Sequence, residues 1–431
     1  MGTFKLSMTI LKREYRQSFF FLATLIGAVA ISFMFFNLLE NPFLKTNEQT
    51  SSGTSISQIS IPPTTLLLIL VLTFVSIMVF FTSDFFMTKK SSAFAILGMS
   101  GSHYMKTTRF LMYQLFVLLG IGISIGIGLG ILATFVANRV IYDYLGIDST
   151  IFTLMPSAFG ALIAVFGTIV LVLVIVSMGY VFRNDILALL SQGRETIKRD
   201  KRALKIPSLF FVALYLYGIF AGLTAKTVND FTGVGMIGCV GSIGIIRYFI
   251  PEYVAKLKKK SLITRKVALI ALSNFVEIIE RSVAVIAMTI FSLIIVGAMM
   301  FGQYQDRRAF IIILIGLFVI IALLFTSILF KVMVEVETRK HFFDNVYHIG
   351  YTKAQIIRII NLELLLYYGV IVVMPLIYLV IMAIKNVLLI GFDPAMAAIT
   401  IGYFMAVGLI SFLGCRHIYI KRVKTFIGRE R

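Results

Sequence analysis

The chain has 431 residues, of which 59% are hydrophobic and only 14% charged, and its mean hydropathy is +0.96. A water-soluble protein of this length would carry about 25% charged residues and could not cover so much apolar surface. The composition therefore excludes a soluble enzyme, a secreted disulfide-rich protein and a disordered chain, and it predicts a membrane protein. The two cysteines, Cys239 and Cys415, offer neither a disulfide framework nor a metal-binding spacing.

Ten segments are long and apolar enough to cross a bilayer, because a span needs about 20 apolar residues. In chain order they are 18–39, 63–83, 110–137, 156–180, 208–224, 232–249, 282–303, 309–331, 361–384 and 394–415. The first is long and lacks a small-residue cleavage site, so we expect a retained anchor and not a cleaved signal peptide. The predicted fold class is an all-α polytopic membrane protein with about ten transmembrane helices.

The loops between the predicted spans differ strongly in charge. Ten spans place both termini on one side, and that side carries 34 of the 40 Lys and Arg residues. The positive-inside rule predicts that this side is the cytoplasm. Topology then accounts for the net charge of +20, and we expect no nucleic-acid partner. The basic runs 198–202 and 258–260 are expected to contact anionic membrane lipids. The longest outer loop, 40–62, is too short to form an extracellular domain.

Two stretches that connect one span to the next resemble each other at an offset of 252 residues. The matched pairs are Gly98 with Gly350, Ser100 with Thr352, His103 with Gln355 and Lys106 with Arg358. A glycine favours the left-handed conformation at a helix end, and Ser or Thr two residues later suits the N-cap of the next helix. Each stretch therefore predicts a helical elbow that points into the cytoplasm. The alternative is a plain capped connection between two spans.

The elbows belong to a longer internal repeat. Amphipathic segments at 4–17 and 267–281 precede the first and seventh spans, and both predict helices along the inner membrane surface. Spans 1–4 thus match spans 7–10, and an even separation of six spans gives the repeats the same orientation. The predicted domains are a first four-helix module over 1–180, a basic loop and linking two-helix hairpin over 181–250, and a second module over 251–431.

Several motifs are absent or misleading. No Walker A pattern, His-x-x-x-His pair or Cys-x-x-Cys pair occurs, so we predict no catalytic residue, metal ligand or cofactor in this chain. The run Gly122-Ile123-Ser124-Ile125-Gly126 matches the nucleophile elbow of hydrolases, but it lies inside a predicted span. With Gly130, its glycines are better interpreted as a close helix-packing surface, as are Gly235, Gly238, Gly241 and Gly244.

A few polar residues and prolines lie in or beside the predicted spans. Asp84 and Glu363 lie at cytoplasmic span ends, where we expect snorkelling or local pairing, and no ladder of carboxylates indicates a proton relay. Pro375 lies in mid-span and predicts a kink. The other seven prolines, including Pro251, are predicted at span ends or in loops.

The two elbows, at 95–100 and 347–356, resemble the FtsX-like permease family of ABC transporters. The segment 184–190 and the ten-span layout resemble the BceB-type bacitracin-resistance permeases within that group. The resemblance implies a bacterial plasma membrane location and a separate ABC ATPase, in two copies per permease, which would bring ATP and Mg²⁺. A sensor histidine kinase is a further candidate partner. The implied ATPase-docking residues are Ser100, Gly101, Ser102, His103, Lys106, Thr352, Lys353, Gln355 and Arg358.

The expected function is therefore that of a permease subunit in antimicrobial peptide resistance or export. One departure is that BceB-type permeases carry a large extracellular domain where this chain has only Tyr304 to Arg308. The alternative from another class is an FtsX-like mechanical or sensor-kinase scaffold that moves no solute. Extraction of lipids or lipoproteins and an ATP-independent channel also stay open. A lipid pyrophosphate target would need cationic partners, and the nearest on the outer side are Arg307 and Arg308.

Overall fold

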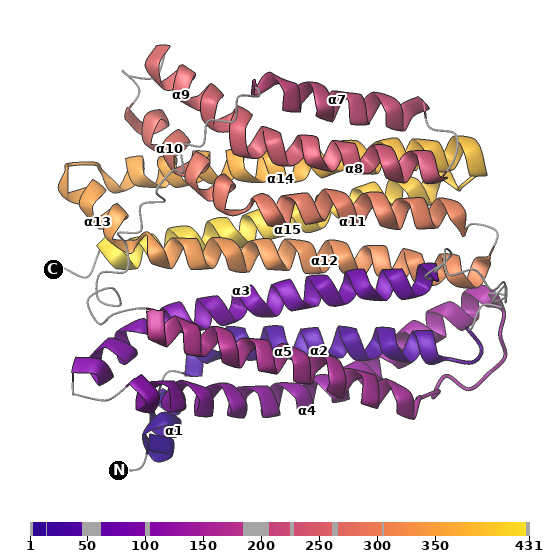
Figure 1. The fold of residues 1–431 in the computed structure, drawn as a ribbon, viewed down its shortest axis with the longest axis horizontal. Coiled ribbons are helices and arrows are strands. Elements are labelled where there is room, and N and C mark those ends of the chain that lie inside the picture. The colour runs from indigo at the N-terminus through magenta and orange to yellow at the C-terminus, as the bar shows by residue number, and fades with distance from the viewer. Residues whose placement is uncertain are drawn as a thin grey trace. The chain divides into compact units, whose positions relative to one another are not determined.

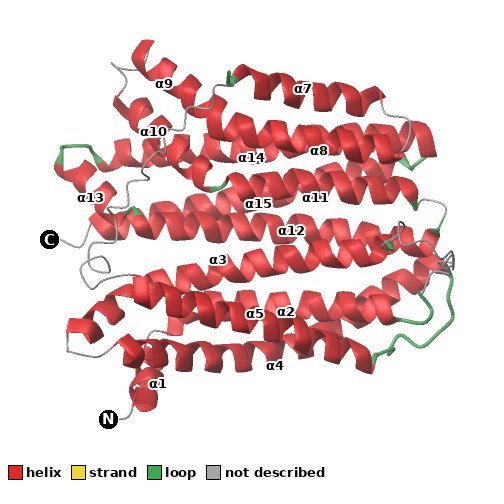
Figure 2. Ribbon diagram, viewed as in Figure 1, coloured by secondary structure: helices red, strands yellow, loops and turns green. Residues whose placement is uncertain are grey.

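The computed structural model describes residues 3–13, 15–44, 62–99, 104–183, 207–224, 228–260, 266–303 and 306–427. Within these ranges all regular elements are helices (Figure 2). Nine of the described helices are long and apolar enough to cross a membrane. A tenth apolar helix, α7, has 16 residues and, at about 1.5 Å per residue, falls short of a bilayer of about 30 Å. The predicted all-α multi-pass membrane fold is confirmed.

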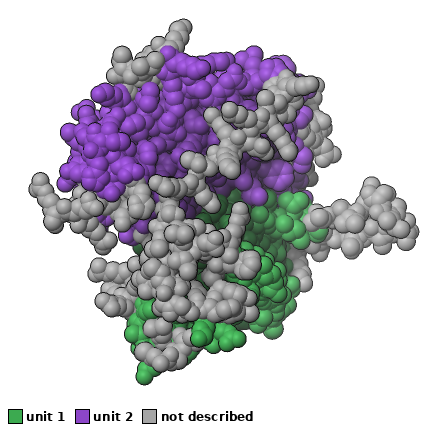
Figure 3. Space-filling view, turned by 60° about the vertical axis from the view of Figure 1, so that its left-hand side comes forward, with its two compact units in different colours: residues 1–194, 306–312 green, residues 195–305, 313–431 purple. Residues whose placement is uncertain are grey.

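The chain divides into two compact units, Met1–Arg194 with Asp306–Ile312 as unit 1 and Glu195–Gln305 with Ile313–Arg431 as unit 2 (Figure 3). Unit 1 holds α1 (Thr3–Arg13), α2 (Tyr15–Glu40), α3 (Pro63–Met99), α4 (Tyr104–Leu145) and α5 (Pro156–Arg183). Unit 2 holds α7 (Leu209–Thr224), α8 (Val228–Gly244), the π-helical segment η1 (Ile245–Phe249), α9 (Ile250–Lys260), α10 (Lys266–Arg281), α11 (Val283–Gly302), most of α12 (Arg307–Thr338), α13 (Lys340–His348), α14 (Lys353–Ile390) and α15 (Pro394–Ile427).

In unit 1, α2 lies at the centre and packs on α3, α4 and α5 (Figure 1). The closest approach is between α2 and α4, where glycines of α4 face larger side chains of α2. A Cβ atom added to Gly126 would lie 2.6 Å from Val29 Cβ, and one added to Gly130 would lie 2.9 Å from Phe33 Cβ. The predicted packing role of these glycines is confirmed. The apparent hydrolase serine, Ser124, donates to Gly120 O within its own helix.

The amphipathic helix α1 crosses the start of α4 in unit 1. Ser7 Oγ donates to Phe110 O over 3.0 Å, and Gln114 Nε2 donates to Ser7 O over 3.2 Å. In unit 2 the amphipathic helix α10 packs on α14. Its place before α11 corresponds to that of α1 before α2. Both predicted amphipathic segments therefore form helices, and each packs on a long helix, α4 in unit 1 and α14 in unit 2.

In unit 2, α8 packs on α7 and α11, and α7 also contacts α14. The glycines of α8 permit these approaches, as predicted: a Cβ on Gly241 would lie 2.6 Å from the backbone nitrogen of Tyr215. Tyr215 Oη in turn donates to Met374 O over 3.0 Å. That carbonyl directly precedes Pro375, which lies inside α14 as predicted.

Two local predictions were wrong. Gly98 does not end its helix, because α3 continues through it to Met99. Pro251 does not lie at a span end or in a loop, because α8, η1 and α9 form one continuous helical run. Proline cannot donate the backbone hydrogen bond of an α-helix. The wider π-turn just before it, in which Ile250 N donates to Ile245 O, accommodates the ring within the helix.

Candidate functional site

The second elbow has the backbone that its sequence predicts. Helix α13 ends at His348, and Gly350 adopts φ +103°, in the region that favours glycine. Gly350 N donates to Tyr347 O over 3.0 Å, which satisfies a carbonyl at the helix end. Thr352 then caps α14. The predicted helix stop at Gly350 and the predicted N-cap at Thr352 are both confirmed.

Thr352 and Gln355 form a reciprocal capping box. Gln355 N donates to Thr352 Oγ1 over 3.3 Å, and Thr352 N donates to Gln355 Oε1 over 2.9 Å. Both side chains are therefore engaged in fixing the start of α14. Of the predicted docking residues on this elbow, Lys353 and Arg358 are the exposed cations, and the capped pair holds them at a defined place on the helix.

The elbow has a buried face and an exposed tip. Phe343 and Val346 of α13 are buried, and the Phe343 ring contacts the ring of Tyr419 in α15 with centroids 5.8 Å apart. At the tip, Ile349 is 76% exposed and Tyr347 is also exposed. An exposed branched aliphatic side chain beside a tyrosine is a surface on which a protein partner can bury apolar area.

The first elbow is described only at its edges. Lys106 lies exposed in the first turn of α4. The predicted docking residues Ser100, Gly101, Ser102 and His103 lie outside the described residues.

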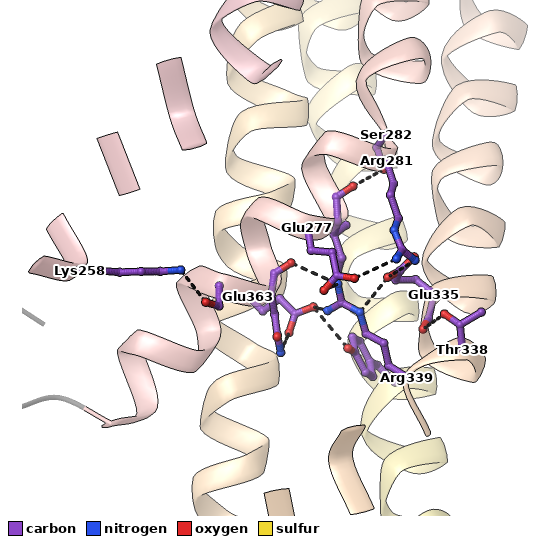
Figure 4. A network of polar contacts seen from close by, with 12 residues as sticks. Lys258, Glu277, Arg281, Ser282, Glu335, Thr338, Arg339 and Glu363 are labelled. Carbon is purple, nitrogen blue, oxygen red and sulfur yellow. Dashed lines mark hydrogen bonds and ion pairs between the residues drawn. The ribbon is translucent and has the colours of Figure 1, made fainter. Parts of the chain in front are cut away.

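A buried ion network lies beneath the second elbow, centred on Arg339 between α12 and α13 (Figure 4). Its Nη1 lies 2.9 Å from Glu363 Oε1, its Nε lies 2.8 Å from Glu335 Oε1, and its Nη2 lies 3.2 Å from Glu277 Oε2. Nη2 also donates to Asn274 O over 3.3 Å. One guanidinium thus joins residues of α10, α12 and α14.

A second guanidinium closes the network on its outer side. Arg281 Nη1 lies 3.2 Å from Glu335 Oε1, and Arg281 Nη2 lies 2.9 Å from Glu277 Oε1. The network therefore has two arginines against three glutamates. Arg339 is 7% exposed and the Glu363 side chain is fully buried, so neither charge is stabilised by bulk water.

Neutral donors complete the coordination of Glu363. Asn274 Nδ2 donates to Glu363 Oε2 over 3.1 Å, and Tyr419 Oη donates to Oε1 over 3.4 Å. Burial opposes the charge on Arg339, but the carboxylates, that of Glu363 foremost, outweigh it and raise the pKa of the guanidinium above its ordinary value. Arg339 therefore stays charged, and the network holds a permanent cation at the base of the elbow.

Sequence reasoning anticipated only part of this network. Pairing of Glu363 was one of the two expectations, and Glu363 is paired, but its cation Arg339 lies 24 positions away and was not singled out. A signal existed in the (i, i+4) spacing of Glu277 with Arg281 and of Glu335 with Arg339 near predicted span ends. That spacing gives no indication that the two pairs meet, because α10 and α12 are distant in the sequence.

The predicted outer cations lie at the opposite end of α12. Arg307 and Arg308 are exposed in its first turn, where Asp306 Oδ1 accepts from Arg308 N over 2.9 Å. The structure brings these two arginines together and leaves them accessible. Among the described residues no group of His, Cys, Asp and Glu is arranged to hold a metal ion.

Comparison with protein-family models and with curated proteins identifies no relative. No protein-family model matches the chain, and no curated protein matches it significantly.

Proposed function

We propose that this chain is the membrane-spanning permease subunit of an ABC transporter of the FtsX-like kind, driven by a separate ATPase and acting in antimicrobial peptide resistance. The observation that carries the proposal is the second elbow, in which a capped turn exposes Ile349 at its tip while its base is fastened by Arg339. A protein that only needed to connect two spans would not need a rigid, ion-paired base under an exposed apolar tip.

The buried network gives the elbow a mechanical role. An ATPase that moved the tip would move α13, and the contacts of Arg339 and of Phe343 would carry that displacement to α10, α12, α14 and α15. Helices that are closely packed and joined by ion pairs move together as a rigid body more readily than they deform. In this proposal the cytoplasm holds both termini and the elbows, and ATP hydrolysis takes place in the partner.

The proposal predicts how elbow variants change the number of bound ATPases. The tagged chain, purified from native membranes, is expected to carry two ATPase copies. Lys106→Glu on the first elbow and Arg358→Glu on the second are each expected to remove one copy, and the double variant both, because a reversed charge repels a complementary surface. Native mass spectrometry of the purified complex counts the copies.

The matched control for this experiment is Lys421→Glu, which makes the same charge change at an exposed position of α15, a helix that carries neither Lys106 nor Arg358. It should keep both ATPase copies. A wild-type chain that carries no ATPase would overturn the proposal and would favour the channel and scaffold alternatives.

A second prediction concerns the outer end of α12. If the transporter handles a lipid pyrophosphate or a peptide bound to one, Arg307→Ala with Arg308→Ala should lower resistance by about tenfold or more, because two charge-assisted contacts are lost. The minimal inhibitory concentration of bacitracin, measured at equal expression, checks this. Arg139→Ala, an exposed cation on α4, is the control, and unchanged resistance in the double variant would contradict the role.

The alternative is an FtsX-like mechanical role without solute movement, and the rigid elbow suits it equally well. The two functions differ in what stimulates the ATPase. In vesicles that contain the chain and its ATPase, a resistance transporter should hydrolyse ATP faster when peptide is added. A mechanical scaffold should respond only to its extracellular or kinase partner.

A further inference from the structure

A groove runs between α14 and α15 at the elbow end of unit 2. Branched aliphatic side chains form its floor, and two lysines stand at its mouth. Its lining residues are Lys353, Ile356, Ile357, Ile360, Ile420, Val423 and Lys424. The empty space between them, including the open mouth, amounts to about 470 Å³.

The two lysines at the mouth differ from the arginines nearby. Arg416 Nε donates to Asn361 Oδ1, and Arg422 lies 3.7 Å from Glu337 Oε1. Lys353 and Lys424 are exposed, and neither forms an ion pair or hydrogen bond with a residue that the structure describes. Lys353 also lies in the first turn of α14, where the helix dipole adds positive potential. The mouth is therefore a site for negative charge.

We propose that this groove binds an anionic phospholipid, with the phosphate between Lys353 and Lys424 and an acyl chain along the aliphatic floor. The site lies where such a lipid would be available, because the apolar part of α14 begins at Lys353 and that of α15 ends at Thr425. Phosphate and ammonium groups supply the charge pairing, and the acyl chain covers the partly exposed side chains of Ile357 and Ile420. Lys353 is also one of the predicted ATPase-docking residues, but the lipid site is inferred from the groove and its two lysines and needs no ATPase partner.

Two other occupants fit less well. Free inorganic phosphate would pair with the lysines but would leave the partly exposed side chains of Ile357 and Ile420 uncovered. An acidic helix from a protein partner would have to approach along the membrane boundary, where lipid is already present at high local concentration. The lipid satisfies both the charge and the apolar floor with one molecule.

The test measures lipid retention by the full-length chain. The protein is placed in bilayer discs containing equal amounts of phosphatidylglycerol and phosphatidylcholine, extracted, and examined by native mass spectrometry. Wild type should retain phosphatidylglycerol in preference to phosphatidylcholine. Lys353→Ala with Lys424→Ala should lower that retention by about tenfold, because each basic residue contributes to anionic lipid binding. Lys256→Ala with Lys421→Ala removes two exposed lysines outside the groove and should leave retention unchanged.

Further measurements distinguish a bound lipid from a bound phosphate ion or protein. An excess of inorganic phosphate should not displace the lipid, and displacement would show a phosphate site instead. Equal retention by the two double variants would overturn the lipid site, as would a groove variant that lost a bound protein while keeping its lipid. If the groove variant fails to fold, wild type can be tested with a phosphatidylglycerol that carries a photoreactive acyl chain. Crosslinks should map to Ile357 or Ile420, and crosslinks found only elsewhere would contradict the proposal.

Discussion

Replacing Arg339 by methionine is expected to destabilise the chain by about 3–5 kcal/mol, because removal of one partner leaves a buried charge without compensation. Glu363 is fully buried, and its other contacts are the neutral donors Asn274 and Tyr419. Glu335 would keep Arg281, but Glu363 would have no cation within reach among the described residues. Methionine retains most of the volume of the side chain, so the loss measures the charge and not a cavity.

The measurement is thermal unfolding in detergent, followed by far-UV circular dichroism because the chain contains no tryptophan. Arg416→Met is the matched control, since Arg416 makes an exposed hydrogen bond to Asn361, and it should cost at most about 1 kcal/mol. Adding Glu363→Gln to Arg339→Met should recover part of the loss, because the unpaired charge is then removed. If Arg339→Met melts like the control, the network does not hold the elbow.

Replacing Gly126 by alanine is expected to destabilise unit 1 by about 1–3 kcal/mol, the usual cost of overpacking. The added Cβ would lie 2.6 Å from Val29 Cβ and 3.0 Å from Ile26 O, and a backbone oxygen cannot rotate away. Helices α2 and α4 would therefore have to separate along the line on which Gly122, Gly126 and Gly130 face Leu25, Val29 and Phe33.

The control for this prediction lies two residues away on the same helix. Nothing lies within 4 Å of a Cβ added to Gly128, so Gly128→Ala should be neutral or slightly stabilising, because alanine favours the helix over glycine by about 1 kcal/mol. The melting temperatures of the two variants should move in opposite directions or differ by several degrees. Equal destabilisation would show that the α2–α4 contact is looser than its geometry indicates.

Properties that depend on neighbouring residues were predictable from the sequence. The membrane class follows from the summed apolar character of each segment, and the capping box follows from Thr352 and Gln355, which are three residues apart. The close packing of Gly122, Gly126 and Gly130 follows from their spacing of four along one helix face. Gly98 was misread because a glycine permits a helix end without requiring one.

Properties that depend on distant segments required the tertiary structure. Asn274 and Glu363 are separated by 89 positions, and Arg339 and Glu363 by 24. No local sequence pattern predicts that these residues will come into contact. The groove is formed in the same way, because α14 supplies three of its aliphatic side chains, α15 supplies two, and each helix supplies one lysine. The sequence by itself determined that this chain spans a membrane and that it turns at Gly350 before Thr352, since those properties depend on adjacent residues. Only the packing of α10, α12, α14 and α15 decided which charges pair and which stay accessible, since that depends on distances that no single segment contains.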